Sequence, residues 1–241
     1  MSKPLIVLTV IAVLTLPQCS ATRHLREEDE PDLPPYEPIQ RRYTNEIELR
    51  RYFGGVFVEI QSPPDTFPFT CEYSNWNLRD YFEGRNFAGK KVNYSGPLVV
   101  TLNTWDELKP RIGAYYVTDA TEKRRFPSPM YPNYFQLYEP EYYYVKRIRH
   151  TMDIRTIMHE AFRMMADLVI HREAFSKEEV KVAMFNYPKR PEFPQMDEIW
   201  IKKVIRPRWG AFQENSAEEL RIIGDMWLSQ EPPPNISFDV V

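Results

Sequence analysis

Histidines are the side chains in this sequence with the clearest capacity for metal or acid–base chemistry, and their spacing decides whether they can act together. Beyond the first 21 residues the chain contains His24, His150, His159 and His171. His159-Glu160 begins like the helical motif of zinc proteases, but the second histidine of that motif falls on Arg163. His150 and His171 stand nine and twelve residues from His159, whereas zinc ligands come at short spacings. We expect no metal site.

The remaining nucleophiles and carboxylates do not assemble into a motif either. Ser95 is followed by Gly96 but lacks the preceding glycine of a nucleophile elbow. Cys71 stands in a segment rich in Phe and Thr, which favours a small core residue over a reactive thiol. The pair Glu178 and Glu179 is typical of the first turn of a helix. We therefore expect neither catalytic residues nor a cofactor.

A run of tyrosines is the most unusual stretch of the sequence. Residues 130–145 contain six tyrosines and are followed by Lys146, Arg147 and Arg149. Aromatic rings beside basic groups can stack nucleic-acid bases and bind phosphates. Here the tyrosines alternate with Pro and Glu, and the whole chain carries a formal charge of −3. This pattern favours a packed or partner-facing aromatic surface, and we expect no nucleic-acid partner.

The first 21 residues have the order of a secretory signal peptide. Lys3 precedes an apolar run from Leu5 to Leu16, Pro17 ends the run, and small residues lead to a cleavage site after Ala21. The alternative is a membrane anchor, but this run has twelve residues, whereas a spanning helix needs roughly 20. We therefore expect residues 1–21 to be removed on secretion, and no integral membrane span in the rest of the chain.

Secretion has consequences for the cysteine and asparagine residues. Removal of residues 1–21 leaves Cys71 as a single thiol, so no internal disulfide can form and the hydrophobic core must stabilise the fold alone. Asn93 and Asn235 begin Asn-X-Ser sequons and are candidates for glycosylation.

The tetrapeptide Arg23-His24-Leu25-Arg26 and the acidic run from Glu27 to Glu30 follow the cleavage site directly. This arrangement resembles the leader of oomycete RxLR effectors, which are plant-pathogen proteins. Residues 22–42 also hold prolines at 31, 34, 35 and 38, and we expect this charged leader to be disordered. The same residues are similar to the R-x-L-x-E export element of malaria-type parasites. Either resemblance implies delivery into a host cell.

The effector resemblance implies a function as well as an address. It implies a secreted, non-enzymatic protein that enters a plant cell, in the nucleus or the cytoplasm, and binds a host protein to suppress host defence or cell death. Arg23, His24, Leu25 and Arg26 would carry delivery. Two alternatives stay open, namely a secreted or membrane-associated structural subunit of a larger assembly, and a secreted enzyme of unrecognised type.

The body of the protein, residues 43–241, is expected to form a single α+β domain. Runs rich in Val, Phe, Tyr and Thr predict strands, whereas capping boxes and an apolar i, i+3, i+4 stripe predict helices. The predicted strands are 55–60, 67–72, 97–102 and 113–118. The predicted helices are 75–83, 151–171 and 196–205, with further starts at Trp105, Ser176 and Ser216. The sequence thus predicts a strand-rich N-terminal half packed with a helical C-terminal half, without an internal repeat of fixed period.

Overall fold

A computed structural model describes the protein over residues 34–40, 46–63, 65–92, 96–104, 111–118, 123–185, 196–205 and 217–229. All described residues belong to one compact unit, Pro31–Val241. The signal peptide, the motif Arg23 to Arg26 and both sequon asparagines lie outside the described residues, as does the helix expected at Trp105. Those expectations stay predictions.

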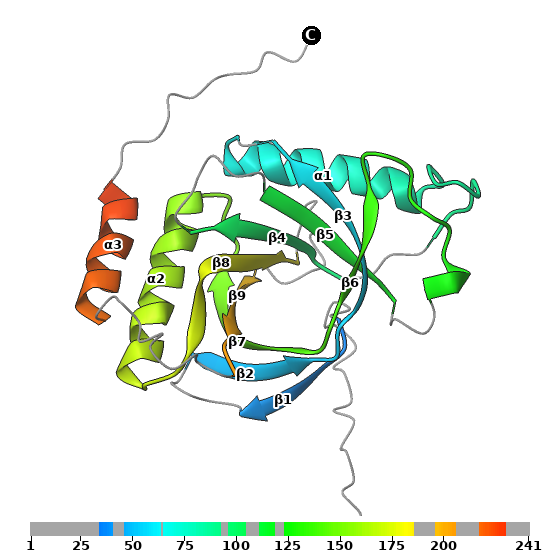
Figure 1. Cartoon of the computed structure of the whole chain (residues 1–241). Helices are drawn as coiled ribbons and strands as arrows, with labels where there is room; N and C mark the ends of the chain where they lie inside the picture. Colours follow the sequence, from blue (N-terminus) through cyan, green and yellow to red (C-terminus); the bar gives the residue numbers. More distant parts are fainter. Residues whose placement is uncertain are drawn as a thin grey trace, which may run out of the picture. The chain divides into compact units, whose positions relative to one another are not determined.

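The described residues form one antiparallel sheet of nine strands (Figure 1). The strands are β1 (Tyr36–Gln40), β2 (Ile47–Tyr52), β3 (Gly55–Ser62), β4 (Leu98–Asn103), β5 (Arg111–Thr118), β6 (Tyr134–Tyr138), β7 (Glu141–Arg149), β8 (Phe175–Met184) and β9 (Met196–Lys203). Their order across the sheet is β1-β2-β7-β9-β8-β4-β5-β3-β6.

The sheet has an internal two-fold relationship about its central pair, β4 and β8. Strands β2 to β5 with the helix between them, and β6 to β9 with theirs, share the order strand, strand, helix, hairpin, and of the consecutive strands in each set only the last two pair with each other. The counterparts are β2 and β6, β3 and β7, β4 and β8, and β5 and β9. When each strand is replaced by its counterpart, the order of strands from β2 to β6 reads the same in the opposite direction. The fold therefore contains a structural repeat that the sequence pattern does not reveal.

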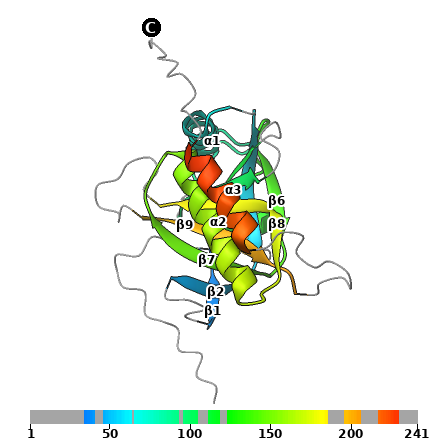
Figure 2. The same ribbon diagram turned by 90° about the vertical axis from the view of Figure 1, so that its left-hand side faces the viewer.

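The helices are α1 (Phe67–Phe82), α2 (Ile154–Ile170) and α3 (Ala217–Ser229), with one short 3-10 turn, η1 (Lys123–Arg125). Pro68 stands in the first turn of α1, where its missing N–H is not needed. The Asp153 side chain caps α2 by accepting hydrogen bonds from the backbone N–H groups of Arg155 and Thr156. Figure 2 shows α3 lying along α2.

The two faces of the sheet carry different hydrophobic clusters. The larger cluster packs strand residues against α1 and α2 and includes Leu78, Phe162 and Ile199. The smaller cluster contains no helical residue and includes Tyr143 and Trp200. Because side chains alternate along a strand, β7 and β9 contribute to both faces. We call the first the helix-covered face and the second the open face.

The coarse fold class, α+β, is confirmed, but the expected division into a strand-rich and a helical half is not. The C-terminal half contributes β6 to β9 as well as α2 and α3. Residues 196–205, predicted as a helix, begin with β9, and the capping-box pattern at Ser176 lies inside β8. Both strands lie in the interior of the sheet, where β9 is buried on both faces from Asp197 to Ile201, so strand pairing prevails over local helix signals.

Two further expectations differ from the structure near the N-terminus. Residues 67–72, predicted as a strand, form the start of α1, whose buried side chains recur three and four positions apart, as Phe67, Cys71, Ser74 and Leu78 show. Strand β1 lies within the leader expected to be disordered, residues 22–42, so ordered structure begins before the expected boundary at residue 43. The predicted strands around 55–60, 97–102 and 113–118 are confirmed as β3, β4 and β5, and the helix 151–171 as α2.

No helix among the described residues is both long enough and apolar enough to cross a membrane.

Candidate functional site

The strongest candidate for a functional group is a histidine held by a buried carboxylate. Nδ1 of His150 lies 2.8 Å from Oδ2 of Asp197. Asp197 is fully buried, whereas the His150 side chain keeps 13% of its surface exposed. The buried carboxylate of Asp197 therefore holds the imidazole of His150, which keeps some of its surface exposed to a ligand.

Two strand ends bring these residues together from positions 47 apart in the sequence. His150 directly follows β7, and Asp197 is the second residue of β9, the neighbouring strand. Ile148 of β7 pairs with Asp197 in the ladder, so His150 is diagonal to the carboxylate on the same side of the sheet. The helix-covered face therefore carries the polar pair His150 and Asp197 where β7 ends and β9 begins.

The electrostatics of the pair follow from its burial. Burial raises the pKa of the Asp197 carboxyl, and the neighbouring His150 imidazole acts in the opposite direction. Oδ1 of Asp197 is buried without a hydrogen-bond partner among the described residues. Nδ1–H of His150 is the side-chain donor to Oδ2, and hydrogen bonds from the backbone of Thr151 and Phe185 also lower the pKa of this carboxyl.

This contact determines which nitrogen of His150 is available. A carboxylate accepts a hydrogen bond, so the contact with Asp197 favours the tautomer that carries the proton on Nδ1. Nε2 then presents a lone pair, and no partner for it is found in the described part of the chain. An imidazole arranged in this way, with its other nitrogen bound to a carboxylate, is the usual form of a metal-ligating histidine.

Sulfur donors lie on the same side of the sheet but cannot reach a ligand. The Sγ of Cys71 lies 3.4 Å from Sδ of Met184, and both residues are fully buried. Met184 pairs with Asp197 in the ladder between β8 and β9. Burial also raises the pKa of the Cys71 thiol, which opposes the thiolate that binds metals. Cys71 is thus a core residue, as its sequence context predicts.

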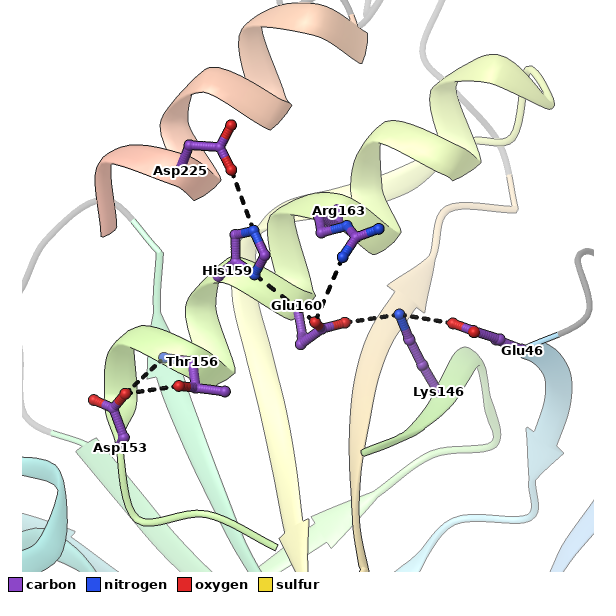
Figure 3. Close-up of polar contacts among 8 residues, drawn as sticks. All are labelled: Glu46, Lys146, Asp153, Thr156, His159, Glu160, Arg163 and Asp225. Carbon is purple, nitrogen blue, oxygen red and sulfur yellow. Dashed lines mark hydrogen bonds and ion pairs between the residues drawn. The ribbon is translucent and has the colours of Figure 1, made fainter. Parts of the chain in front are cut away.

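The other two described histidines have different surroundings. Figure 3 shows His159 between α2 and α3, where Nε2 lies 3.2 Å from Asp225 and Nδ1 lies 3.8 Å from Glu160. Both ring nitrogens of His159 therefore face carboxylates already. His171 caps the C-terminal end of α2 and is exposed. Neither histidine combines an anchored nitrogen with an available one.

The open face of the sheet is rich in charge, but its groups bind one another. Arg50 lies 2.9 Å from Glu198, and the indole of Trp200 donates to the same carboxylate. Tyr138 donates to Glu59 at 2.6 Å. Within the described residues, no group of three or more His, Cys, Asp or Glu side chains is arranged to hold a bare metal ion.

Sequence reasoning placed no functional role on His150 or Asp197. It compared His150 with His159 and rejected a zinc site, but it could not identify a carboxylate 47 residues away. The only local signal is that His150 comes directly after a β-rich run and three residues before the N-cap Asp153. The tyrosines of residues 130–145 are in part core residues, since Tyr143 and Tyr144 are buried on opposite faces.

Comparison with known families gives a match over most of the described chain. The model of the SOUL heme-binding protein family matches residues 32–202. This range includes β1 to β8, β9 except its last residue, α1, α2 and the pair His150 and Asp197, whereas α3 lies beyond it. No curated protein matches the sequence.

Several solved structures resemble the chain at low sequence identity. EcmrR in its DNA complex has a TM-score of 0.49 at 11% identity, over 66% of this chain and 58% of that chain. The EcmrR C-terminal domain has a TM-score of 0.49 at 9% identity, over 66% and 98% of the two chains. SAV2435 bound to tetraphenylphosphonium has a TM-score of 0.40 at 10% identity, over 66% and 94%. Nothing about function follows from these similarities.

The family match overturns the function expected from the leader. A heme-binding family does not fit a plant-pathogen effector that suppresses host defence, and it does not support a structural subunit either. The error has a clear cause, because the effector resemblance rested on Arg23, Leu25 and Arg26 with the acidic run that follows. The matched range begins only at residue 32, after that leader.

Proposed function

This chain belongs to the SOUL heme-binding protein family, and we propose that it binds heme with His150 as an axial ligand of the iron. The observation that carries the ligand assignment is the 2.8 Å contact between Nδ1 of His150 and the buried carboxylate of Asp197. Heme held through His150 would supply an iron centre for redox or ligand-binding chemistry, tuned by the side chains around it.

The donor set of the structure fits this group. Heme iron takes His, Cys, Met or Tyr as axial ligands. Cys71 and Met184 are fully buried beside the pair, which leaves His150 as the accessible ligand at this place. The surroundings are also suitably apolar, since Cys71, Met184 and Ile148 all belong to the core of the helix-covered face.

Asp197 is assigned a positioning role in this proposal. Its carboxylate fixes the orientation of the imidazole and keeps the proton on Nδ1. Because Asp197 is buried on an interior strand, turning the imidazole away would remove the side-chain donor of a buried carboxylate.

Heme titration of four proteins tests the assignment. The wild type should develop a Soret band, and His150→Ala should shift the band and weaken heme binding. Asp197→Asn should weaken binding by about 10- to 100-fold. His171→Ala, which removes an exposed histidine, should behave as the wild type. Metal-free protoporphyrin IX should bind wild type and His150→Ala equally, because it has no iron to coordinate.

Two results would distinguish a failure of the proposed heme binding from a failure of the assignment of His150 as the ligand. A wild-type protein that binds neither heme nor protoporphyrin contradicts the function itself. A His150→Ala variant with an unchanged Soret band and unchanged affinity leaves heme binding intact but contradicts His150 as the ligand. Circular dichroism of each variant establishes that it is folded.

We also infer that the protein acts after export from the cell that makes it. The order of Lys3, the apolar run from Leu5 to Leu16 and the small residues up to Ala21 supports this inference. N-terminal sequencing of the protein recovered from the medium should begin at Thr22. Recovery of the chain only inside cells, beginning at Met1, would contradict it.

A further inference from the structure

One corner of the molecule exposes large apolar side chains on three neighbouring segments. Trp76 of α1 is 73% exposed, Phe87 is 75% exposed, and Met130 and Tyr131 are 41% and 96% exposed. We call these four residues the apolar corner. Exposed apolar side chains of this size cost solvation free energy, and clustered ones mark interaction surfaces.

Backbone and side-chain hydrogen bonds hold the three segments together. The N–H of Phe87 donates to the carbonyl of Ser128 at 3.1 Å, and Asn86 forms an isolated bridge with Pro129. The amide of Asn133 donates to the carbonyl of Asn77, the residue after Trp76. The loop carrying Met130 and Tyr131 thus runs beside both α1 and the turn that carries Phe87 (Figure 1).

Two buried asparagines make this arrangement rigid. Asn86 is 5% exposed, and its amide donates to the carbonyls of Tyr81 and Lys90 while its oxygen accepts from two backbone N–H groups. Asn133 is 8% exposed and closes a turn in which its N–H donates to the carbonyl of Met130. Tyr81 adds a hydrogen bond from its hydroxyl to the carbonyl of Pro127. The apolar side chains are therefore presented by a fixed scaffold.

The charge around the apolar corner is positive, although the whole chain is negative. Residues 76–91 and 123–133 together contain seven basic and two acidic residues, whereas the chain has a formal charge of −3. Both acids are already paired, Asp80 with Arg85 at 2.5 Å and Glu83 with Arg79 at 3.0 Å. Lys90, Lys91 and Lys123 are exposed. The surplus charge therefore faces outward beside the apolar side chains.

We propose that the apolar corner and its basic rim dock the protein onto an anionic lipid bilayer. Trp and Tyr favour the interface between lipid and water, and lysines beside them attract anionic headgroups. A protein partner is less well matched, because protein interfaces are depleted in lysine. Exposed side chains on a helix surface, a turn and a loop also suit shallow insertion better than a groove would.

Vesicle sedimentation tests the proposal. The wild type should sediment with phosphatidylcholine vesicles that contain phosphatidylserine and much less with phosphatidylcholine alone, and high salt should release it. Trp76→Ser with Phe87→Ser and Tyr131→Ser should lower the vesicle affinity by at least about tenfold. Lys90→Glu with Lys91→Glu should lower it by about tenfold or more.

Two control variants test whether vesicle binding depends specifically on the apolar corner. Ile170→Ser removes an apolar side chain that is 54% exposed on α2, away from the apolar corner, and should leave vesicle binding unchanged. His150→Ala should also bind vesicles as the wild type does, which separates docking from heme binding. Equal binding to both vesicle types, no binding to either, or wild-type binding by the folded Ser variant would each overturn the proposal. Unfolding curves show whether that variant is folded.

Discussion

Nη1 of Arg50 and Oε2 of Glu198 lie 2.9 Å apart on the open face of the sheet, and neither side chain is more than 3% exposed. Trp200 donates its indole N–H to the same Glu198 oxygen, and Glu48 binds Arg50 from the other side at 2.7 Å. An ion pair buried in this way is costly to disrupt on one side, because without Arg50 the buried Glu198 keeps only its longer 3.4 Å ion pair with the half-exposed Arg147.

Arg50→Ala should therefore destabilise the protein by about 3–5 kcal/mol in urea unfolding. Arg51→Ala is the matched control, since Arg51 is 39% exposed and lies 3.9 Å from the exposed Glu37, and it should cost less than about 1 kcal/mol. Arg50→Met combined with Glu198→Gln should recover about 1–3 kcal/mol relative to Arg50→Ala, because the amide still accepts from Trp200 and no charge remains buried. Equal costs for Arg50→Ala and Arg51→Ala would contradict this account.

Glu59 makes the stability of the sheet depend on pH. Burial raises the pKa of this carboxyl above its ordinary value, while the hydrogen bond from Tyr138 acts in the opposite direction. An acid whose pKa is higher in the folded than in the unfolded state stabilises the fold below its unfolded pKa and loses that contribution as the pH rises through the folded value. Glu59→Gln should therefore gain stability relative to the wild type as the pH rises from 4 to 8.

Urea unfolding at several pH values measures this difference. Glu139→Gln, at an exposed position, controls for the loss of one negative charge. A Glu59→Gln variant that lost stability relative to the wild type as the pH rose would show that the ionised carboxylate is stabilised in the fold.

The contact between α3 and α2 depends on a glycine. A Cβ placed on Gly224 would lie 3.1 Å from Cβ of Phe162 and 3.6 Å from the ring of His159. Gly224→Val should therefore force the helices apart and cost about 1–3 kcal/mol of stability. Backbone amides of α3 should also exchange their hydrogens faster than in the wild type.

Leu228→Val, on an exposed residue of the same helix, controls for the lower helix propensity of valine. Since α3 lies outside the range matched by the family, its release should leave heme binding intact. Unchanged exchange in Gly224→Val would mean that α2 and α3 can adjust to the added side chain.

The success of the strand and helix predictions depended on how strong the local signal was. The stripe from Ile154 to Val169 repeats over several turns and has an N-cap at Asp153, so the sequence alone predicts α2. Residues 67–72 and 196–205 are short segments whose apolar residues fit either period. Packing decides whether each segment becomes a helix or a strand. Residues 67–72 belong to α1, which packs one buried stripe against the sheet, and β9 pairs with both β7 and β8.

The sequence by itself determined the α+β class, the strands around Val58, Val100 and Tyr115, the core position of Cys71 and the signal-like order of residues 1–21. These features follow from local composition and periodicity. The tertiary structure alone decided the two-fold arrangement about β4 and β8, and it alone brought Asp197 to His150. Strand pairing is a long-range choice, made by the burial of whole faces, and no local pattern around His150 encodes which carboxylate it will meet.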